Sequence, residues 1–307
     1  MLEKGGFNIR EPEQKAVIFY NQGKEELILS VKYQGEVEDF AWLVPLPEPP
    51  RIEESDFGIF ELLDHVTSER NEKVGDGTEG IDEGVEVIEE RTVGAFDLTT
   101  LEAEGAEELR GWLNRNGLGY QEEAESVFVD YIERGWCFVA MRVNPDNSGE
   151  AADDLREGTI DPLRFTFHAQ QPIYPLYISS LNPGHCEVLI FVLGDEAYTC
   201  GGMEMLYANN WENIHLEMLK GYSEMSEELG RKGGCDVTKL RGYFAPEEME
   251  DLYFQPAEPE LLAQVKRNLV SVGGDGLKVD FWFIAIAILV LLEIEFIIMV
   301  VARYGKR

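Results

Sequence analysis

The stretch QKAVIFYNQGKEELILSVKYQG, residues 14–35, decides the fold expected for this chain. Its two halves, Gln14–Asn21 and Glu25–Gly35, are rich in the β-branched and aromatic residues that β-strands favour. Between them, Asn21-Gln22-Gly23-Lys24 has the residue types of a tight turn. The stretch therefore predicts a β-hairpin, and with it an antiparallel sheet near the start of the chain.

Further runs of β-branched and aromatic residues extend this sheet along the chain. The first, DFAWLVPLP, contains Pro45 and Pro47, and we expect these prolines to stop the strand. Phe40 and Trp42 in this run are core residues or, as an alternative, part of an aromatic and proline recognition surface. The expected strands cover residues 39–47, 85–90, 93–98, 136–143, 163–169, 176–181, 187–193 and 236–244.

A smaller number of segments have helical periodicity. In residues 56–70, Phe57, Phe60, Leu63 and Val66 are spaced for one helix face, and Asp56 is a suitable N-cap. Further helices are expected at 104–116 and 121–134, with a helical turn at 246–251 and a helix between 259 and 271. Clustered helices among hairpins predict an α+β fold with mostly antiparallel sheet.

The segment FWFIAIAILVLLEIEFIIMVVA, residues 281–302, is expected to be a membrane-spanning helix. As a helix it would rise about 33 Å, which matches a hydrocarbon core of roughly 30 Å. Trp282 and Tyr304 lie near its two ends, where aromatic residues gather at membrane interfaces. The domain plan that follows is an acidic ectodomain at 1–256, in one or two subdomains, a linker at 257–280, the anchor and a basic tail at 303–307.

Glu293 and Glu295 lie near the middle of this apolar segment. Two charges there cost about 5–7 kcal/mol, and the apolar residues offset about 4.5–9 kcal/mol, so insertion is only narrowly favourable. Two positions apart on a helix, the carboxylates point about 200° away from each other. They are either tolerated through snorkelling or protonation, or they pair with other helices in an assembly.

The charge balance restricts the partners. The chain has 59 acidic and 26 basic residues, a net charge of −33. Such a surface repels nucleic acid, because phosphate binding needs cationic contacts. It suits solvent, cations or a basic partner, and the interpretation we favour is that the charge only keeps the protein soluble. The basic tail, Arg303–Arg307, favours a cytoplasmic C-terminus and places the large domain outside the cell.

Four cysteines are the candidates for covalent cross-links. Cys186 and Cys200 flank a segment centred on Leu193, which favours a disulfide across a hairpin, and Cys137 with Cys235 would form a second one. No CxxC pair is present, so a zinc ribbon is not indicated.

Metal sites are weighed against simpler interpretations. His168 and His185 could gather with the cysteines, but their spacing matches no zinc signature. Acidic residues at 76–83 and 146–154 resemble calcium loops in composition, but neither has the EF-hand pattern. Solvated loops are favoured, and we expect no metal and no cofactor.

Catalytic motifs do not appear in the sequence. There is no GxSxG elbow, phosphate loop or HExxH pair, so no catalytic residue is assigned. The favoured hypothesis is a membrane-anchored surface module that binds envelope or membrane proteins or assembles with itself. The alternative is an exported hydrolase that uses an unrecognised pair of carboxylates.

Several segments in a fixed order resemble one known family. They are Gly5-Gly6 with EPEQKAVI, then YQGEVEDFAWLVPLPEPP, VGAFDLTTLEAEGAEELRGWLNRNGL and YIERGWCFVAMRVN, followed by PLRFTF, PIYPLYISSL and VTKLRGYFAPEEMEDLYF. This order resembles the prokaryotic family known as domain of unknown function 2330. The resemblance implies an exported protein, often with a Cys-Gly-Gly start and a C-terminal anchor. It assigns no activity and no catalytic residues to this chain. Here Lys4 stands where that cysteine would be.

Overall fold

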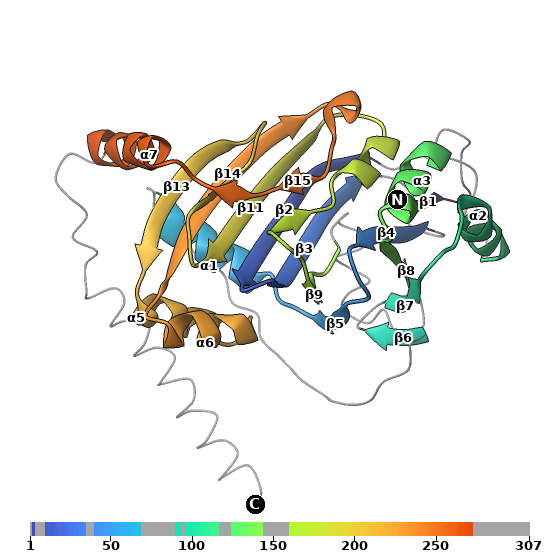
Figure 1. Ribbon diagram of the computed structural model, residues 1–307, viewed down its shortest axis with the longest axis horizontal. Helices are drawn as coiled ribbons and strands as arrows, with labels where there is room; N and C mark the ends of the chain where they lie inside the picture. Colours follow the sequence, from blue (N-terminus) through green and yellow to red (C-terminus); the bar gives the residue numbers. More distant parts are fainter. Residues whose placement is uncertain are drawn as a thin grey trace, which may run out of the picture. The chain divides into compact units, whose positions relative to one another are not determined.

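The computed structural model describes residues 2–3, 10–34, 40–68, 90–93, 96–116, 124–143 and 160–272 (Figure 1). The chain divides into two compact units, Met1–Lys266 and Arg267–Arg307. The first unit contains all the described strands. It is a mixed α+β structure with mostly antiparallel sheets, as the sequence predicts.

A seven-stranded sheet forms the larger part of this unit. All neighbouring strands are antiparallel except β11 and β2, which run parallel. In spatial order the strands are β13 (Glu204–Trp211), β14 (Cys235–Phe244), β11 (Cys186–Gly194), β2 (Arg10–Asn21), β3 (Lys24–Gln34), β9 (Leu163–His168) and β5 (Arg51–Glu54).

The hairpin expected at residues 14–35 is confirmed by β2 and β3 in the centre of this sheet. Tyr20 pairs with Glu25 and Asn21 pairs with Lys24, so Gln22 and Gly23 form a two-residue turn. Both turn residues have positive φ, 51° and 84°. Positive φ at both central positions is the type I′ geometry that matches the twist of the strands.

A five-stranded sheet carries the remaining long strands. Its order is β1 (Leu2–Glu3), β4 (Phe40–Leu46), β8 (Cys137–Val143), β7 (Phe96–Leu101) and β6 (Glu90–Val93), all antiparallel. Pro45 does not stop β4 as expected, because it pairs with Phe138 of β8. On its other side, β4 pairs with β1 among the described strands, and only through Phe40 and Ala41. Pro45 therefore removes no ladder hydrogen bond on the β1 side. Trp42 is buried, which confirms its core assignment.

Helices cover one face of the larger sheet. In Figure 1, α1 (Gly58–Thr67) lies across the back of the sheet, and α5 (Asn213–Leu216) and α6 (Glu224–Arg231) lie at the turn end of the hairpin. The N-cap position of α1 is Phe57 rather than the expected Asp56, which lies one residue earlier. Asp56 Oδ1 still accepts a hydrogen bond from the backbone N–H of Gly58 at 2.6 Å. The helices and sheet share one apolar core, in which each buried large side chain contributes about 1.5–3 kcal/mol. The core includes Val17, Phe19, Ile28, Ile59, Phe60, Leu63, Phe191, Leu216, Leu219, Met225 and Leu229.

The remaining elements are three helices, three 3-10 turns and two pairs of short strands among the described residues. The helices are α2 (Ala106–Arg115), α3 (Glu125–Glu133) and α7 (Pro259–Val272), which confirm three of the expected ones. The 3-10 turns are η2 (Tyr177–Leu181), η3 (Glu217–Leu219) and η4 (Pro246–Glu248), and the paired short strands are β10 (Ile173–Tyr174) with β15 (Leu252–Tyr253) and β12 (Tyr198–Thr199) with β16 (Gln255–Pro256).

The strand expected at 176–181 is wrong, because η2 occupies that segment. None of the helices in the described ranges has the length and apolarity to cross a membrane. The anchor expected at 281–302, with Glu293 and Glu295, lies outside the described residues.

Candidate functional site

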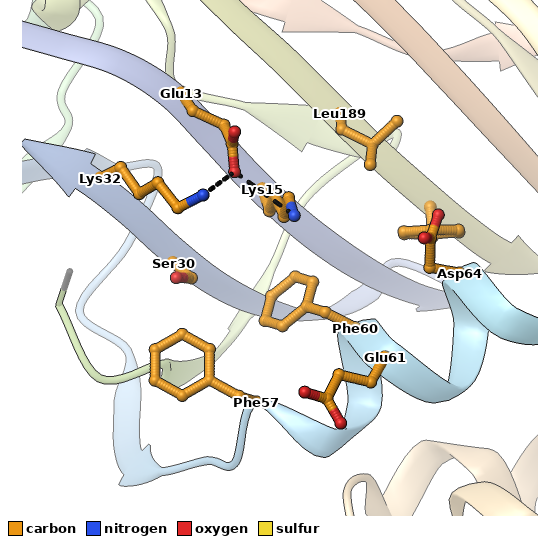
Figure 2. A pocket seen from close by; sticks show the side chains of 10 residues that line it. Glu13, Lys15, Ser30, Lys32, Phe57, Phe60, Glu61, Asp64 and Leu189 are labelled. Carbon is orange, nitrogen blue, oxygen red and sulfur yellow. Dashed lines mark ion pairs between the residues drawn. The ribbon is translucent and has the colours of Figure 1, made fainter. Parts of the chain in front are cut away.

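A pocket of about 240 Å³ lies between the seven-stranded sheet and α1 (Figure 2). Strands β2, β3 and β11 form its floor, and the first two turns of α1 form a wall. In Figure 2 the rings of Phe57 and Phe60 lie beside Lys15 and Ser30 on the strands. The lining residues are Glu13, Lys15, Ser30, Lys32, Phe57, Phe60, Glu61, Asp64, Leu189 and Phe191.

The pattern of β2 places the pocket where the apolar cover of the sheet ends. Alternate residues of a strand face the same side, so Glu13, Lys15, Val17 and Phe19 share one face. Val17 and Phe19 are fully buried in the core under the helices. At Lys15 the sequence changes from apolar to charged, and the sheet surface opens to solvent beside the start of α1.

Glu13 is the centre of the charge on the sheet side. Its carboxylate Oε1 lies 3.0 Å from the Lys32 ammonium and 3.3 Å from that of Lys15. Partial burial works against its charged form, but the hydrogen bond and charge of Lys32, with those of Lys15, outweigh burial and hold the pKa of Glu13 below its usual value. One carboxylate therefore orients two lysines over the floor of the pocket.

The helix side of the pocket carries two acids with different surroundings. Asp64 accepts a hydrogen bond from the Lys239 ammonium at 2.5 Å, and Lys239 also lies 5.4 Å from the centre of the Phe191 ring. Glu61 is exposed and, within the described ranges, has no ion-pair partner. The only uncompensated lining carboxylate in those ranges is therefore that of Glu61.

The exposed sheet surface continues from the pocket across β11 and β14. Glu187 pairs with both Glu13 and Tyr243, so the three side chains share this face. Tyr243 is 62% exposed, and its hydroxyl donates to Glu187 Oε1 at 3.0 Å. The guanidinium of Arg241 lies 5.7 Å from the Tyr243 ring centre. We call the pocket with Glu187, Arg241 and Tyr243 the docking surface.

Polar clusters elsewhere in the fold hold elements together. Asp251 accepts hydrogen bonds from the Tyr131 hydroxyl at 2.7 Å, from Arg134 at 2.8 Å and from the Tyr177 amide at 3.0 Å. Burial raises the pKa of Asp251, and these three donors oppose that rise. The cluster ties α3, η2 and the segment before β15 together, which is a structural role.

A second polar cluster lies at the opposite end of β2 from the hairpin turn. Gln14 donates to Glu11 at 2.7 Å and to the Ser179 hydroxyl at 2.8 Å, and it accepts from the Tyr174 hydroxyl at 2.6 Å. All four side chains are buried. Their donors and acceptors are matched to one another, so this network fixes η2 against β2.

Two further carboxylates, Glu25 and Glu26, are fully buried on β3. Glu25 Oε2 accepts from the Ile173 amide at 3.0 Å, and Glu26 Oε2 accepts from the Ser223 hydroxyl at 2.6 Å. The second oxygen of each has no hydrogen-bond partner within the described residues. Burial raises the pKa of both, and for Glu26 the Ser223 hydrogen bond and the charges of Arg164 and Lys24 oppose the rise. As neighbours on one strand they face opposite sides of the sheet.

The structure corrects the predicted disulfides, because the four cysteines are free. After Gly194 the chain does not return along β11, whose two edges are occupied by β14 and β2. Cys200 instead follows β12, which pairs with β16. Cys137 lies in the smaller sheet and Cys235 in the larger one, so the second predicted pair also has no basis. Burial raises the pKa of Cys200 to about 11, and of Cys137 and Cys235 to about 12.

The histidines considered as possible metal ligands do not come together with the cysteines. His168 is exposed and contacts Glu48 at 2.6 Å, and His185 is exposed as well. No group of three or more potential metal ligands occurs among the described residues. The acidic segments at 76–83 and 146–154 lie outside them. Sequence reasoning did not identify Glu13, Lys15, Lys32 or Glu61, and only the change from apolar to charged residues along one face of β2 signalled the pocket.

The fold and site define an α+β domain with a pocket over the central strands of its larger sheet, where the helical cover of that sheet ends. The chain belongs to the bacterial family described as uncharacterized protein conserved in bacteria (DUF2330), whose model matches residues 1–200. None of the curated proteins matches the chain. Among solved structures, the crystal structure of baculovirus P35 is similar with a TM-score of 0.39 and 10% identity, covering 81% of this chain and 98% of that chain. At that score no argument about function follows from it.

Proposed function

We propose that this protein is a single-pass, membrane-anchored surface module whose large domain binds a partner protein of the cell envelope. In this proposal the ectodomain lies outside the cell, residues 281–302 span the membrane and the tail at 303–307 is cytoplasmic. The apolar length of 281–302 and the basic residues after it support the anchor and its orientation. The resemblance of the sequence to a family of exported proteins also supports an outside location.

The observation that carries the binding role is the docking surface. It combines an apolar pocket, an exposed tyrosine and paired charges on a rigid sheet. Protein interfaces use this combination, with a buried anchor residue at the centre and a polar rim around it. Because β2, β3, β11 and β14 are central strands, the surface is preformed and binding would order little additional chain.

The described carboxylates favour binding over the alternative of hydrolysis. A glycosidase-like mechanism needs two carboxyl groups that converge on one substrate bond. Of the three carboxylates that line the pocket, Glu13 is paired with two lysines and Asp64 with Lys239, which leaves only Glu61 without an ion pair among the described residues. Glu25 and Glu26 are buried on opposite faces of β3. Hydrolysis therefore remains the second candidate, and it lacks a specific observation in its favour.

The anchor contributes a separate part of the proposal. Glu293 and Glu295, if membrane-embedded, are costly without partners. Their opposite directions on a helix suit contacts with two neighbouring helices, so the anchor would take part in an envelope assembly or in self-assembly.

The experiment uses the full chain in its own membrane. Protease added to intact cells is expected to degrade the large domain, and full protection would contradict the outside location. Gently solubilised protein is then compared by native mass for wild type, Glu293→Leu/Glu295→Leu and Phe57→Ala, with Glu247→Gln on the exposed side of η4 as the matched control. The Glu293→Leu/Glu295→Leu and Phe57→Ala variants are expected to form complexes of lower native mass than wild type. The Glu247→Gln control is expected to keep the wild-type mass. An unchanged complex in both, or a monomeric wild type, would contradict the proposal.

A further inference from the structure

The pocket between β2, β3, β11 and α1 has a size and charge that select one kind of anchor. We infer that it accepts an aromatic side chain that a partner protein presents next to a basic residue, with the basic group at Glu61. This inference rests on the proposed partner-binding function and adds the chemistry of the contact.

The volume of the pocket suits one ring. An engineered apolar cavity of about 150 Å³ holds benzene, and pockets for drug-sized ligands measure about 300–1,000 Å³. At about 240 Å³, this pocket has room for a ring and a short polar extension. The pocket is partly open to solvent, so it would hold a free small molecule only weakly. An anchor side chain held by a larger interface fits these dimensions.

The apolar lining is arranged for an aromatic group. Phe60 and Phe191 are nearly or fully buried, and Phe57 and Leu189 are packed against the same core. Aromatic rings from α1 and from the sheet therefore border the space on two sides. A ring inserted there would make edge or offset contacts with them, which are the favoured arrangements of aromatic pairs.

The charges on the rim favour a basic neighbour. Lys15 and Lys32 share the carboxylate of Glu13, and Asp64 is paired with Lys239. Glu61 is the lining carboxylate that remains without an ion pair among the described residues. A cation beside the ring would pair with Glu61 and lie against the phenyl faces. The net charge of −33 also raises the association rate of a basic segment.

Three small probes separate ring from charge. Saturation-transfer NMR on the detergent-solubilised full chain would compare phenethylamine, 3-phenylpropionate and butylamine, which carry ring and cation, ring and anion, and cation alone. Phenethylamine is expected to bind most tightly. Glu61→Gln is expected to weaken it about 2- to 5-fold, the range for an exposed ion pair, without affecting 3-phenylpropionate. Phe57→Ala is expected to weaken both ring probes, and Glu247→Gln neither.

Several outcomes would overturn the inference. If 3-phenylpropionate binds as well as or better than phenethylamine, the lysines rather than Glu61 select the partner. If butylamine matches phenethylamine, or no probe binds the pocket, no aromatic anchor is involved. Because Glu61 is exposed, Glu61→Gln keeps the fold, and unchanged near-UV circular dichroism verifies this. Failure of the probes while Phe57→Ala still releases a partner would reject the anchor chemistry and leave the proposed function standing.

Discussion

The buried carboxyl of Glu25 gives a prediction whose sign and size follow from its surroundings. The side chain is 0% exposed, and one of its oxygens accepts a hydrogen bond from the Ile173 amide. Burial raises the pKa of Glu25, and the Ile173 amide opposes that rise. The Tyr20 phenol lies opposite Glu25 in the hairpin, and the charge of Glu25 adds to the rise in the pKa of Tyr20. Replacement by glutamine keeps the shape and the acceptor for Ile173, and it removes the ability to ionise.

The direction of the effect comes from proton linkage. Burial raises the pKa of Glu25 well above that of an unfolded chain, about 4.3. A group with a raised folded pKa contributes its stability fully below the unfolded pKa. That contribution is lost as the pH rises from the unfolded pKa towards the folded one.

The size of the effect has an upper limit. In this pH window wild type loses up to about 1.4 kcal/mol of unfolding free energy per pH unit relative to Glu25→Gln. Between pH 5 and 7.5 the relative gain of the variant therefore reaches at most about 3.4 kcal/mol. Near pH 4.3 the two proteins are expected to have similar stability, apart from a cost of about 1–3 kcal/mol if the new amide N–H group finds no acceptor.

The assay is urea unfolding of the full chain at a series of pH values, followed by tryptophan fluorescence. Trp42, Trp136 and Trp211 are buried and therefore report on unfolding. Taking the difference between variant and wild type removes the contributions of the other acidic residues, provided that the m-values agree. Glu247→Gln, the same substitution at an exposed site, is the matched control.

Two results would refute this reasoning. A stability difference between Glu25→Gln and wild type that is constant from pH 4 to 8 would mean that Glu25 titrates normally. A difference that falls as the pH rises would mean that the charged form is the one stabilised by the fold, through a partner that the described residues do not include.

Three other predictions concern stability and thiol chemistry. Gly234→Ala is expected to destabilise the chain by about 1–3 kcal/mol, because φ is +129° and the new Cβ would clash with the Trp211 carbonyl oxygen. Gly201→Ala, with open space around the new Cβ, should be neutral, and denaturation midpoints check both variants. Asp251→Asn is expected to cost about 1.5–3 kcal/mol through weaker hydrogen bonds in its buried cluster, and a wild-type midpoint would contradict that. A thiol reagent is expected to modify at most Cys200 in the native chain, because the other three cysteines are buried, and all four thiols after denaturation. Fewer than four modified thiols after denaturation would indicate that a disulfide is present.

The local parts of the fold were predictable from the sequence, and the non-local parts were not. The hairpin of β2 and β3 depends on residues 14–35 alone, and its strands and turn were found correctly. Residues 176–181 look like a strand in composition, yet they form η2. Their amides have distant partners, since Tyr177 donates to Asp251 and Ile178 donates to the Tyr131 hydroxyl. Tertiary hydrogen bonds overrode the local preference for extended chain.

The pocket was beyond sequence reasoning for a similar reason. Its residues come from three strands and a helix, and β11 joins β2 only through a parallel pairing of residues more than 170 positions apart. The predicted disulfide failed at the same point, because symmetry about Leu193 indicated a hairpin where β11 instead pairs with β14 and β2. Periodicity describes which face a residue occupies, but it does not say which strands lie side by side.

Site-specific photo-crosslinking from the pocket tests the central claim most directly. A photoreactive amino acid at Phe57 or Leu189 of the full chain, in its native membrane, is expected to cross-link one envelope protein. Mass spectrometry should place the cross-link at an aromatic residue adjacent to a lysine or arginine, and Glu61→Gln should weaken the product. The same probe at Glu247 should give none. Equal products from all three positions, or products from Glu247 alone, would contradict partner binding through this pocket.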